Sequence, residues 1–145
     1  MRKEKFTNIT ISYMRRIGPY GSKNIELMES LKEHIKSKDL FNDQLVILGI
    51  ALDDPNNTPP NQLRYDVGLI TGEDGVEGLK TRKIDDGLYA IFEVEHTQEG
   101  VHSFWENIKE LTANLNIDYQ RPILERYTMR KIKNHMCEFC VPLIE

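Results

Sequence analysis

Glu125 is the residue whose neighbours in the sequence most strongly suggest a chemical role. It lies in the segment LERYTMRK, residues 124–131, where β-branched and aromatic neighbours favour a strand. Because alternate residues of a strand share a face, Glu125 would lie between Ile123 and Tyr127. A carboxylate among apolar groups needs a partner. A bound organic cation is one candidate partner, and an arginine or lysine beside a partly exposed strand is the alternative.

Aromatic side chains on other expected elements could complete a site for a cation. Trp105, the only tryptophan, is expected on an apolar helical stripe, and three further aromatic residues lie on three different expected strands. The face of each ring attracts a cation with an energy on the order of 0.5–2 kcal/mol. Simple core packing is the alternative for each ring. The candidate ligand-binding residues are Glu125, Trp105, Tyr13, Tyr65, Phe92 and Tyr127.

Two other residue pairs are expected to be structural. Cys137 and Cys140 form a C-x-x-C pattern, but a closed zinc site draws its ligands from two such pairs and the chain has one. On a strand the two cysteines would also face opposite sides, so we expect free thiols, with a redox or metal role as the alternative. Arg64 and Asp66 share one face of an expected strand and are expected to form an ion pair. No pattern predicts a cofactor.

The elements that must position these residues occur in an order that repeats. Both expected helices carry apolar residues at spacings of three and four, and Ser22 is the expected N-cap of the first. The first half is expected to hold a strand at 7–17, a helix at 22–38 and strands at 45–52 and 63–71. The second half is expected to hold a strand at 88–96, a helix at 101–117 and strands at 121–128 and 136–144.

The repeat predicts the fold. Aligning Gly21 with Gly100 gives an offset of 100 − 21 = 79, which moves the strand at 45–52 onto 124–131. We therefore expect an α+β fold of two tandem strand–helix–strand–strand units. These would form one antiparallel sheet with both helices on one side and a ligand groove at the pseudo-twofold seam. A ferredoxin-like sandwich is the alternative. The expected division of the single domain 1–145 is a first half at about 6–71, a connector at 72–87 and a second half at 88–145.

Composition and charge disfavour several classes of protein. The 145 residues are 39% hydrophobic and 29% charged, which is typical of a folded domain. With 19 basic and 23 acidic residues, the net charge of −4 disfavours nonspecific nucleic-acid binding. No apolar run approaches the roughly 20 residues of a membrane span, and no apolar segment follows the basic N-terminus. We expect a cytoplasmic protein that binds neither nucleic acid nor membranes directly.

Four groups of motifs occur in order along the chain: YMRRIGPYG, GIALDDPNNTPPNQLRYDVGL, YAIFEVEHT with GVHSFW, and RPILERY with EFCVPL. Together and in this order they resemble the GyrI-like family, the effector-binding domain of AraC-type and multidrug-responsive regulators. The resemblance covers nearly the whole chain. It implies a groove for amphipathic, cationic or aromatic compounds that Glu125 faces. Because the family-like sequence begins by about residue 8, we expect a stand-alone member without an upstream DNA-binding domain.

Three functions remain open, so the sequence does not decide whether the protein is an enzyme. We expect first a protein that binds cationic or aromatic compounds, with Glu125 as the counter-charge. The resemblance also implies a hydrolase of strained-ring, cyclopropanoid alkylating toxins, in which Glu125 would be the general base. The name of the family implies a third function, inhibition of DNA gyrase by direct contact. DNA gyrase and a transcription regulator are therefore the candidate protein partners.

Overall fold

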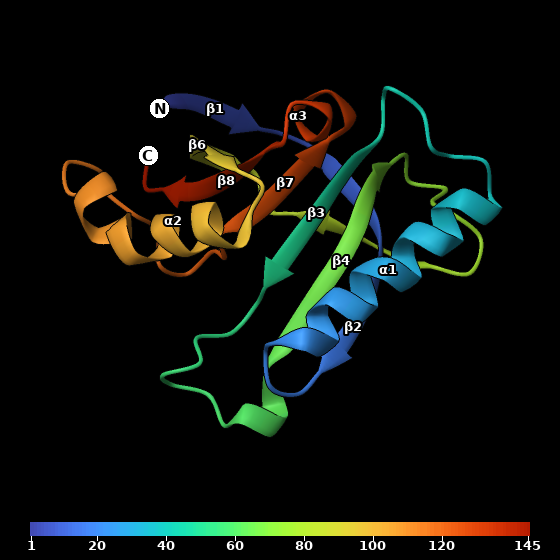
Figure 1. The fold of residues 1–145 in the computed structure, drawn as a ribbon, viewed down its shortest axis with the longest axis horizontal. Helices are drawn as coiled ribbons and strands as arrows, with labels where there is room; N and C mark the ends of the chain where they lie inside the picture. Colours follow the sequence, from blue (N-terminus) through green and yellow to red (C-terminus); the bar gives the residue numbers. More distant parts are fainter.

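One eight-stranded antiparallel sheet forms the scaffold of the molecule (Figure 1). The computed structural model describes residues 1–145. The strands are β1 (Arg2–Phe6), β2 (Ile9–Ile17), β3 (Val46–Ala51), β4 (Arg64–Thr71), β5 (Lys80–Ile84), β6 (Gly87–Glu95), β7 (Leu124–Thr128) and β8 (Met136–Leu143). The helices are α1 (Ser22–Ser37), α2 (Gln98–Leu111) and the short α3 (Met129–Lys133), with a 3-10 turn at Pro60–Gln62. None of the helices combines the length and apolar character that a membrane crossing requires.

The order of the strands has a pseudo-twofold pattern. It runs β1-β6-β8-β7-β3-β4-β2-β5, so that β7 and β3 lie side by side at the centre. Outward from this seam, the first half continues as β3-β4-β2-β5 and the second as β7-β8-β6-β1. Each half is built from a strand, a helix and two strands, with one additional edge strand. Every pairing is antiparallel, which confirms the expected fold class.

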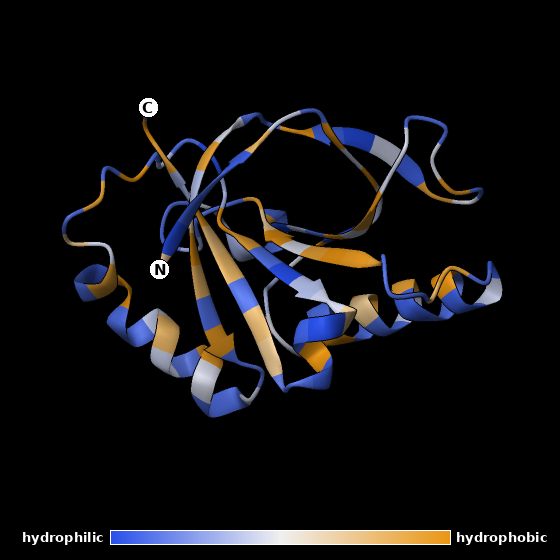
Figure 2. Cartoon of the chain, turned by 90° about the horizontal axis from the view of Figure 1, so that it is seen from above, coloured by the Kyte–Doolittle hydropathy of each residue, from blue (hydrophilic) through white to orange (hydrophobic).

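Both long helices pack on the same face of the sheet, as expected. Leu31 and Ile35 of α1 are fully buried against the strands of the first half. Phe104 of α2 is buried against β6 and β8, where its ring stacks on Phe139 with the centroids 4.2 Å apart. Figure 2 shows α1 and α2 along one side of the arched sheet, with apolar stripes alternating with polar ones. The helices therefore enclose two cores that meet at the seam.

The opposite face of the sheet curls around a third core. Side chains from β1, β2, β3, β5, β6, β7 and β8 form it, among them the fully buried Leu48 and Leu124. Cys140 belongs to this core, whereas Cys137 lies on the helix side. The two cysteines are buried free thiols on opposite faces, as expected. Burial raises the pKa of Cys137 to about 11 and that of Cys140 to about 12.

The two edge strands differ from expectation. Residues 2–6 were expected to precede the first strand, and 72–87 to be a connector, but they contain β1 and β5. Their sequences, RKEKF and KTRKI, are strongly charged. Lysine on an edge strand protects the unpaired backbone from pairing with another chain. The charge that suits an edge therefore removes the apolar alternation by which a strand is predicted.

Several element ends also differ from expectation. Gly21, at φ 151°, precedes α1 without a side-chain cap, so Ser22 is the first helical residue and not the N-cap. The second helix begins at Gln98, because the Thr97 side chain accepts a hydrogen bond from the Gly100 N–H at 2.9 Å. It ends at Leu111, six residues earlier than expected. The strand expected at 121–128 begins at Leu124, and its basic continuation forms α3.

The expected ion pair between Arg64 and Asp66 is wrong. Arg64 pairs with Asp53 at 2.8 Å. Asp66 is fully buried and accepts hydrogen bonds from Arg15 at 2.6 Å and from Arg82 at 2.8 Å. Two residues that share a face of one strand, such as Arg64 and Asp66, lie about 6.6 Å apart along it, whereas residues directly opposite each other on paired strands are closer. The register places Arg15 opposite Asp66, so the cross-strand partner is favoured.

Candidate ligand-binding site

A pocket of about 640 Å³ lies beneath the first half of α1, beside the seam. The strands β3, β4 and β7 form its floor, α1 forms one wall, and α3 with the residue after β6 forms the other. The lining residues are Asn24, Ile25, Met28, Glu29, Lys32, Phe41, Ile47, Tyr65, His96, Glu125, Tyr127, Met129 and Ile132. Eight of the 13 are hydrophobic, so the pocket is an apolar hollow with few polar groups.

Glu125 lies on the floor of this pocket, directly across the seam from Gly49 of β3. A Cβ atom at position 49 would lie 2.6 Å from the Tyr65 hydroxyl oxygen and 3.3 Å from Glu125 Oε2. Both oxygen atoms therefore extend over the backbone of the glycine. This explains why an isolated glycine occurs within the buried strand VILGIA, since it permits a close approach.

The carboxyl group of Glu125 has no basic partner within the chain. Its single side-chain hydrogen bond comes from the Tyr127 hydroxyl, which donates to Oε2 at 2.5 Å. Burial raises the pKa of Glu125, and this hydrogen bond only partly opposes the shift. The carboxyl group of the empty pocket therefore favours the neutral acid. Glu125 is therefore not a strand carboxylate paired with an arginine or lysine, which was the alternative.

Two phenol groups flank this carboxyl group. Tyr65 is 6% exposed, and burial raises its pKa, with the nearby Glu125 as the second cause. Burial likewise raises the pKa of Tyr127, again reinforced by Glu125. Both phenols therefore stay neutral at physiological pH. The floor of the pocket offers one ionisable acid and two aromatic rings.

The charges at the mouth of the pocket largely cancel. Lys32 Nζ lies 3.5 Å from Oε1 of Glu29, one turn earlier in α1. His96 packs against Tyr127, with the ring centroids 5.4 Å apart. Burial, together with the charge of Lys32, lowers the pKa of His96, so its imidazole is neutral at neutral pH. Glu125 is therefore the one acid of the pocket without a compensating charge.

Flexible and exposed apolar side chains form the upper wall. Ile25 of α1 and Phe41 of the following loop are 65% and 43% exposed at the mouth. Met28, Met129 and Ile132 line the interior. Methionine side chains adapt to differently shaped ligands because they are unbranched and polarisable. This wall suits aromatic or aliphatic groups without demanding one shape.

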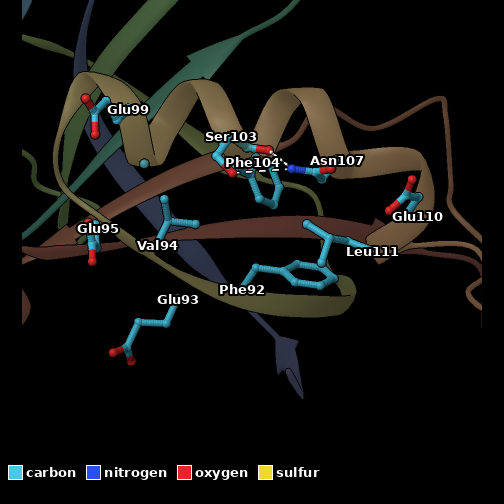
Figure 3. Close-up of a pocket in the computed structure, with 11 residues that line it drawn as sticks. Phe92, Glu93, Val94, Glu95, Glu99, Ser103, Phe104, Asn107, Glu110 and Leu111 are labelled. Atoms are coloured by element: carbon cyan, nitrogen blue, oxygen red, sulfur yellow. Dashed lines mark hydrogen bonds between the residues drawn. The ribbon is translucent and has the colours of Figure 1, made fainter.

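The structure brings together three of the six candidate residues: Glu125, Tyr65 and Tyr127. Phe92 of β6 and Trp105 of α2 belong to the second half, where Trp105 is 44% exposed and Phe92 borders another hollow (Figure 3). Tyr13 lies on the opposite face of the sheet, with Arg15 and Arg82 at 5.5 and 5.2 Å from its ring centroid. The alternation of a strand fixes which residues share a face, but not which face borders the pocket.

Sequence reasoning missed several lining residues. Met28 was expected only as a member of the apolar stripe of α1, and His96 as the end of a strand. Met129 and Ile132 follow the strand expected at 121–128, where no site residue was expected. Gly49 gave the one usable signal, because an isolated glycine in a buried strand often marks a close approach.

A curled antiparallel sheet with a partly apolar pocket under one helix defines a small-molecule-binding domain of the α+β class. The chain matches the model of the GyrI-like small molecule binding domain over residues 1–144, and it belongs to this family. It is 42% identical over 144 residues to the SPbeta prophage-derived protein YosT of Bacillus subtilis (strain 168), named as a candidate transcriptional regulator. The match covers 97% of this chain and 96% of YosT.

Two solved structures share the fold. SAV2435 bound to tetraphenylphosphonium has a TM-score of 0.67 at 12% identity, covering 99% of this chain and 93% of that chain. The C-terminal domain of EcmrR has a TM-score of 0.71 at 8% identity, covering 99% of this chain and 96% of that chain. At such low identity these likenesses establish the architecture and not the ligand.

Proposed function

We propose that the protein binds aromatic organic cations in the pocket beside the seam between β3 and β7, with Glu125 as the counter-charge. We refer to this pocket as the seam pocket. One observation carries this proposal: the carboxyl group of the half-buried Glu125 lies on the pocket floor among apolar and aromatic groups, without a basic partner. An ionised carboxylate in such surroundings is costly unless it is paired. A bound cation supplies the missing charge, so the pocket selects for charge as well as for apolar shape.

The rest of the pocket supports a ligand with both aromatic and cationic character. The rings of Tyr65 and Tyr127 flank the carboxyl group, and each aromatic face contributes on the order of 0.5–2 kcal/mol to the binding of a cation. The apolar upper wall would cover the remainder of the ligand. The hydroxyl oxygen of Tyr65 adds a second acceptor beside Glu125 for a ligand that carries an N–H group.

The comparisons support this class of ligand. The structure of SAV2435 contains tetraphenylphosphonium, an aromatic cation, within the same fold. YosT, at 42% identity, is named as a candidate transcriptional regulator. We propose that occupancy of the pocket is either a means of sequestering such cations or a signal that a transcription regulator reads.

Two ions of equal shape and opposite charge test the proposal. We expect isothermal titration calorimetry to show that tetraphenylphosphonium binds at least about tenfold more tightly than tetraphenylborate, since one charge interaction exceeds about 1.4 kcal/mol. In Glu125→Gln, tetraphenylphosphonium should lose about 1.5–3 kcal/mol of binding free energy, the scale of two opposite unit charges about 6–10 Å apart at an effective dielectric constant of about 20. Glu26→Gln is the matched control, because Glu26 is exposed on α1 and does not line the pocket.

Equal binding of the two ions, or an unchanged affinity in Glu125→Gln, would show that Glu125 is not the counter-charge. The same variant separates binding from the hydrolase alternative. If the protein hydrolyses strained-ring alkylators, Glu125→Gln should abolish product formation while binding of the substrate largely survives.

A further inference from the structure

A second hollow, of about 620 Å³, lies between α2 and β6, away from Glu125 (Figure 3). Its apolar floor consists of Phe92, Val94, Phe104 and Leu111. Leu111, at the end of α2, is 45% exposed and points toward the ring of Phe92. We refer to this hollow as the α2–β6 groove.

The border of the α2–β6 groove is strongly acidic. Glu93, Glu95, Glu99 and Glu110 line it, and no lysine or arginine does. Glu93 pairs with Lys131 of α3, whereas the other three glutamates form no ion pair. The groove therefore combines an apolar floor with uncompensated negative charge.

In the first half of the molecule, the chain itself covers part of the helix side of the sheet. The loop 72–79 crosses the helix side of β2, where the Val76 N–H donates to Ser12 Oγ at 3.1 Å. A carbonyl of the loop lies 2.8 Å from His34 Nε2 on α1. Val76 and Leu79, three residues apart, pack onto the core of the first half.

The strand register gives the counterpart of this place in the second half. The loop leaves β4 at Thr71 and enters β5 at Lys80, and these two residues pair with β2 positions three residues apart. In the second half, Leu143 of β8 and Arg2 of β1 pair with Leu88 and Ile91 of β6. The α2–β6 groove begins at the next residue, Phe92, so it adjoins the counterpart of the place that the loop covers.

We propose that the α2–β6 groove docks an extended segment of another protein that carries two apolar side chains about three residues apart, flanked by lysine or arginine. The loop 72–79 shows that the helix side of this sheet accepts two apolar side chains at this spacing. The glutamates determine the charge of the segment, because an acidic one such as the loop itself, GEDGVEGL, would be repelled. Docking at this groove does not depend on the ligand proposed for the seam pocket.

A phage-displayed library of random peptides about 12 residues long, selected on the immobilised full chain, tests this proposal. We expect enrichment of peptides with an apolar pair three residues apart and a basic flank. The affinity of a synthetic enriched peptide should fall at least about tenfold in Leu111→Lys and in Glu99→Lys combined with Glu110→Lys. Ile25→Lys, a substitution at an exposed apolar residue of the other helix, should leave the affinity unchanged, as should Glu125→Gln.

Three results would overturn the proposal. The first is enrichment without basic residues, or no enrichment. The second is peptide binding that Leu111→Lys leaves intact. Peptide binding that tetraphenylphosphonium displaces and that Ile25→Lys weakens would likewise overturn it, because the peptide would then lie in the seam pocket. The third is a dimer that Leu111→Lys dissociates, which would make a second copy the occupant. Thermal unfolding of each variant verifies that its fold is intact.

Discussion

At the scale of residues, the candidate site depends on the carboxyl group of Glu125, which lies in an unfavourable setting. Gly49 leaves space for it, Tyr127 donates one hydrogen bond to it, and no base compensates it. Such an arrangement reduces stability in the empty protein and becomes favourable when a cation binds. Polar groups retained at a cost to stability are typical of functional sites.

The pH dependence of stability follows from the raised pKa of Glu125. A raised pKa in the folded protein means that the contribution to stability is complete below the unfolded value, near pH 4.5, and is lost as pH rises through the folded value. We therefore expect Glu125→Gln to match the wild type at about pH 4 and to be more stable at about pH 8. The difference in unfolding free energy should be about 1.4 kcal/mol for each unit by which folding raises the pKa of this carboxyl group. Urea unfolding without ligand at both pH values measures this, and a variant that is less stable at the higher pH would contradict it.

Substitution of Gly49 should close the floor of the pocket. In Gly49→Ala the added methyl group meets the Tyr65 hydroxyl oxygen at 2.6 Å, so this ring or the Glu125 side chain must move. We expect a loss of about 1–3 kcal/mol of stability, as in other overpacked interiors, and at least about tenfold weaker cation binding. Gly72→Ala is the control, since its Cβ would meet nothing within 4 Å. An unchanged affinity in Gly49→Ala would place the ligand elsewhere.

Part of this site could be predicted from the sequence. The alternation of a strand correctly placed Glu125 and Tyr127 on one face, because that inference requires only local geometry. Tyr13 could not be assigned in the same way, since the face that borders the pocket depends on the pairing of β2 with β4. Trp105 lies on the helix of the other half, and only the tertiary arrangement separates it from the seam.

At the scale of elements, α1 has two parts with different roles. Its C-terminal half holds the fully buried Leu31 and Ile35, whereas its N-terminal half covers the pocket and buries little. The N-terminus also has no side-chain cap. The helix is therefore anchored at one end and lines the ligand site at the other.

Alanine substitutions should separate these two roles. Leu31→Ala removes a fully buried side chain and should cost about 2–5 kcal/mol of stability. Ile25→Ala, at a 65% exposed position, should change stability by less than about 0.5 kcal/mol but weaken the binding of tetraphenylphosphonium. Thermal unfolding and calorimetry on both variants measure the two effects. Equal losses of stability would contradict this division of α1.

The elements were predictable to the extent that they are amphipathic. Both long helices and the six inner strands carry the apolar periodicity of their type, whereas β1 and β5 do not. The ends of α2 depend on the Thr97 cap and on a loop that returns to the sheet, where Ile117 pairs with Leu143. Long-range contacts of this kind are not encoded in local periodicity.

At the scale of the whole molecule, the seam between β3 and β7 makes the two halves one structure. Their pairing extends the sheet without interruption from β1 to β5, and Tyr127 packs against the cores of both halves. A half without its partner would expose the seam strand and the floor of the pocket. We therefore infer that neither half is an independent folding unit.

The seam predicts a single cooperative unfolding transition. Trp105 is the only tryptophan and lies in α2, so its fluorescence reports on the second half, whereas far-ultraviolet circular dichroism reports on both. Because the halves share the sheet, the two signals should give the same midpoint and slope in urea. Separated midpoints would show that the halves unfold independently.

The pH dependence of cation binding tests the central claim most directly. The affinity for tetraphenylphosphonium should rise with pH through the titration range of Glu125 in the empty protein and level off above it, because the bound cation requires the ionised carboxylate. His96, Glu29 and Lys32 also face the pocket, and Glu125→Gln isolates their contribution. We predict a strong dependence in the wild type and a nearly flat profile in Glu125→Gln. The same profile in both proteins would contradict the assignment of Glu125 as the counter-charge.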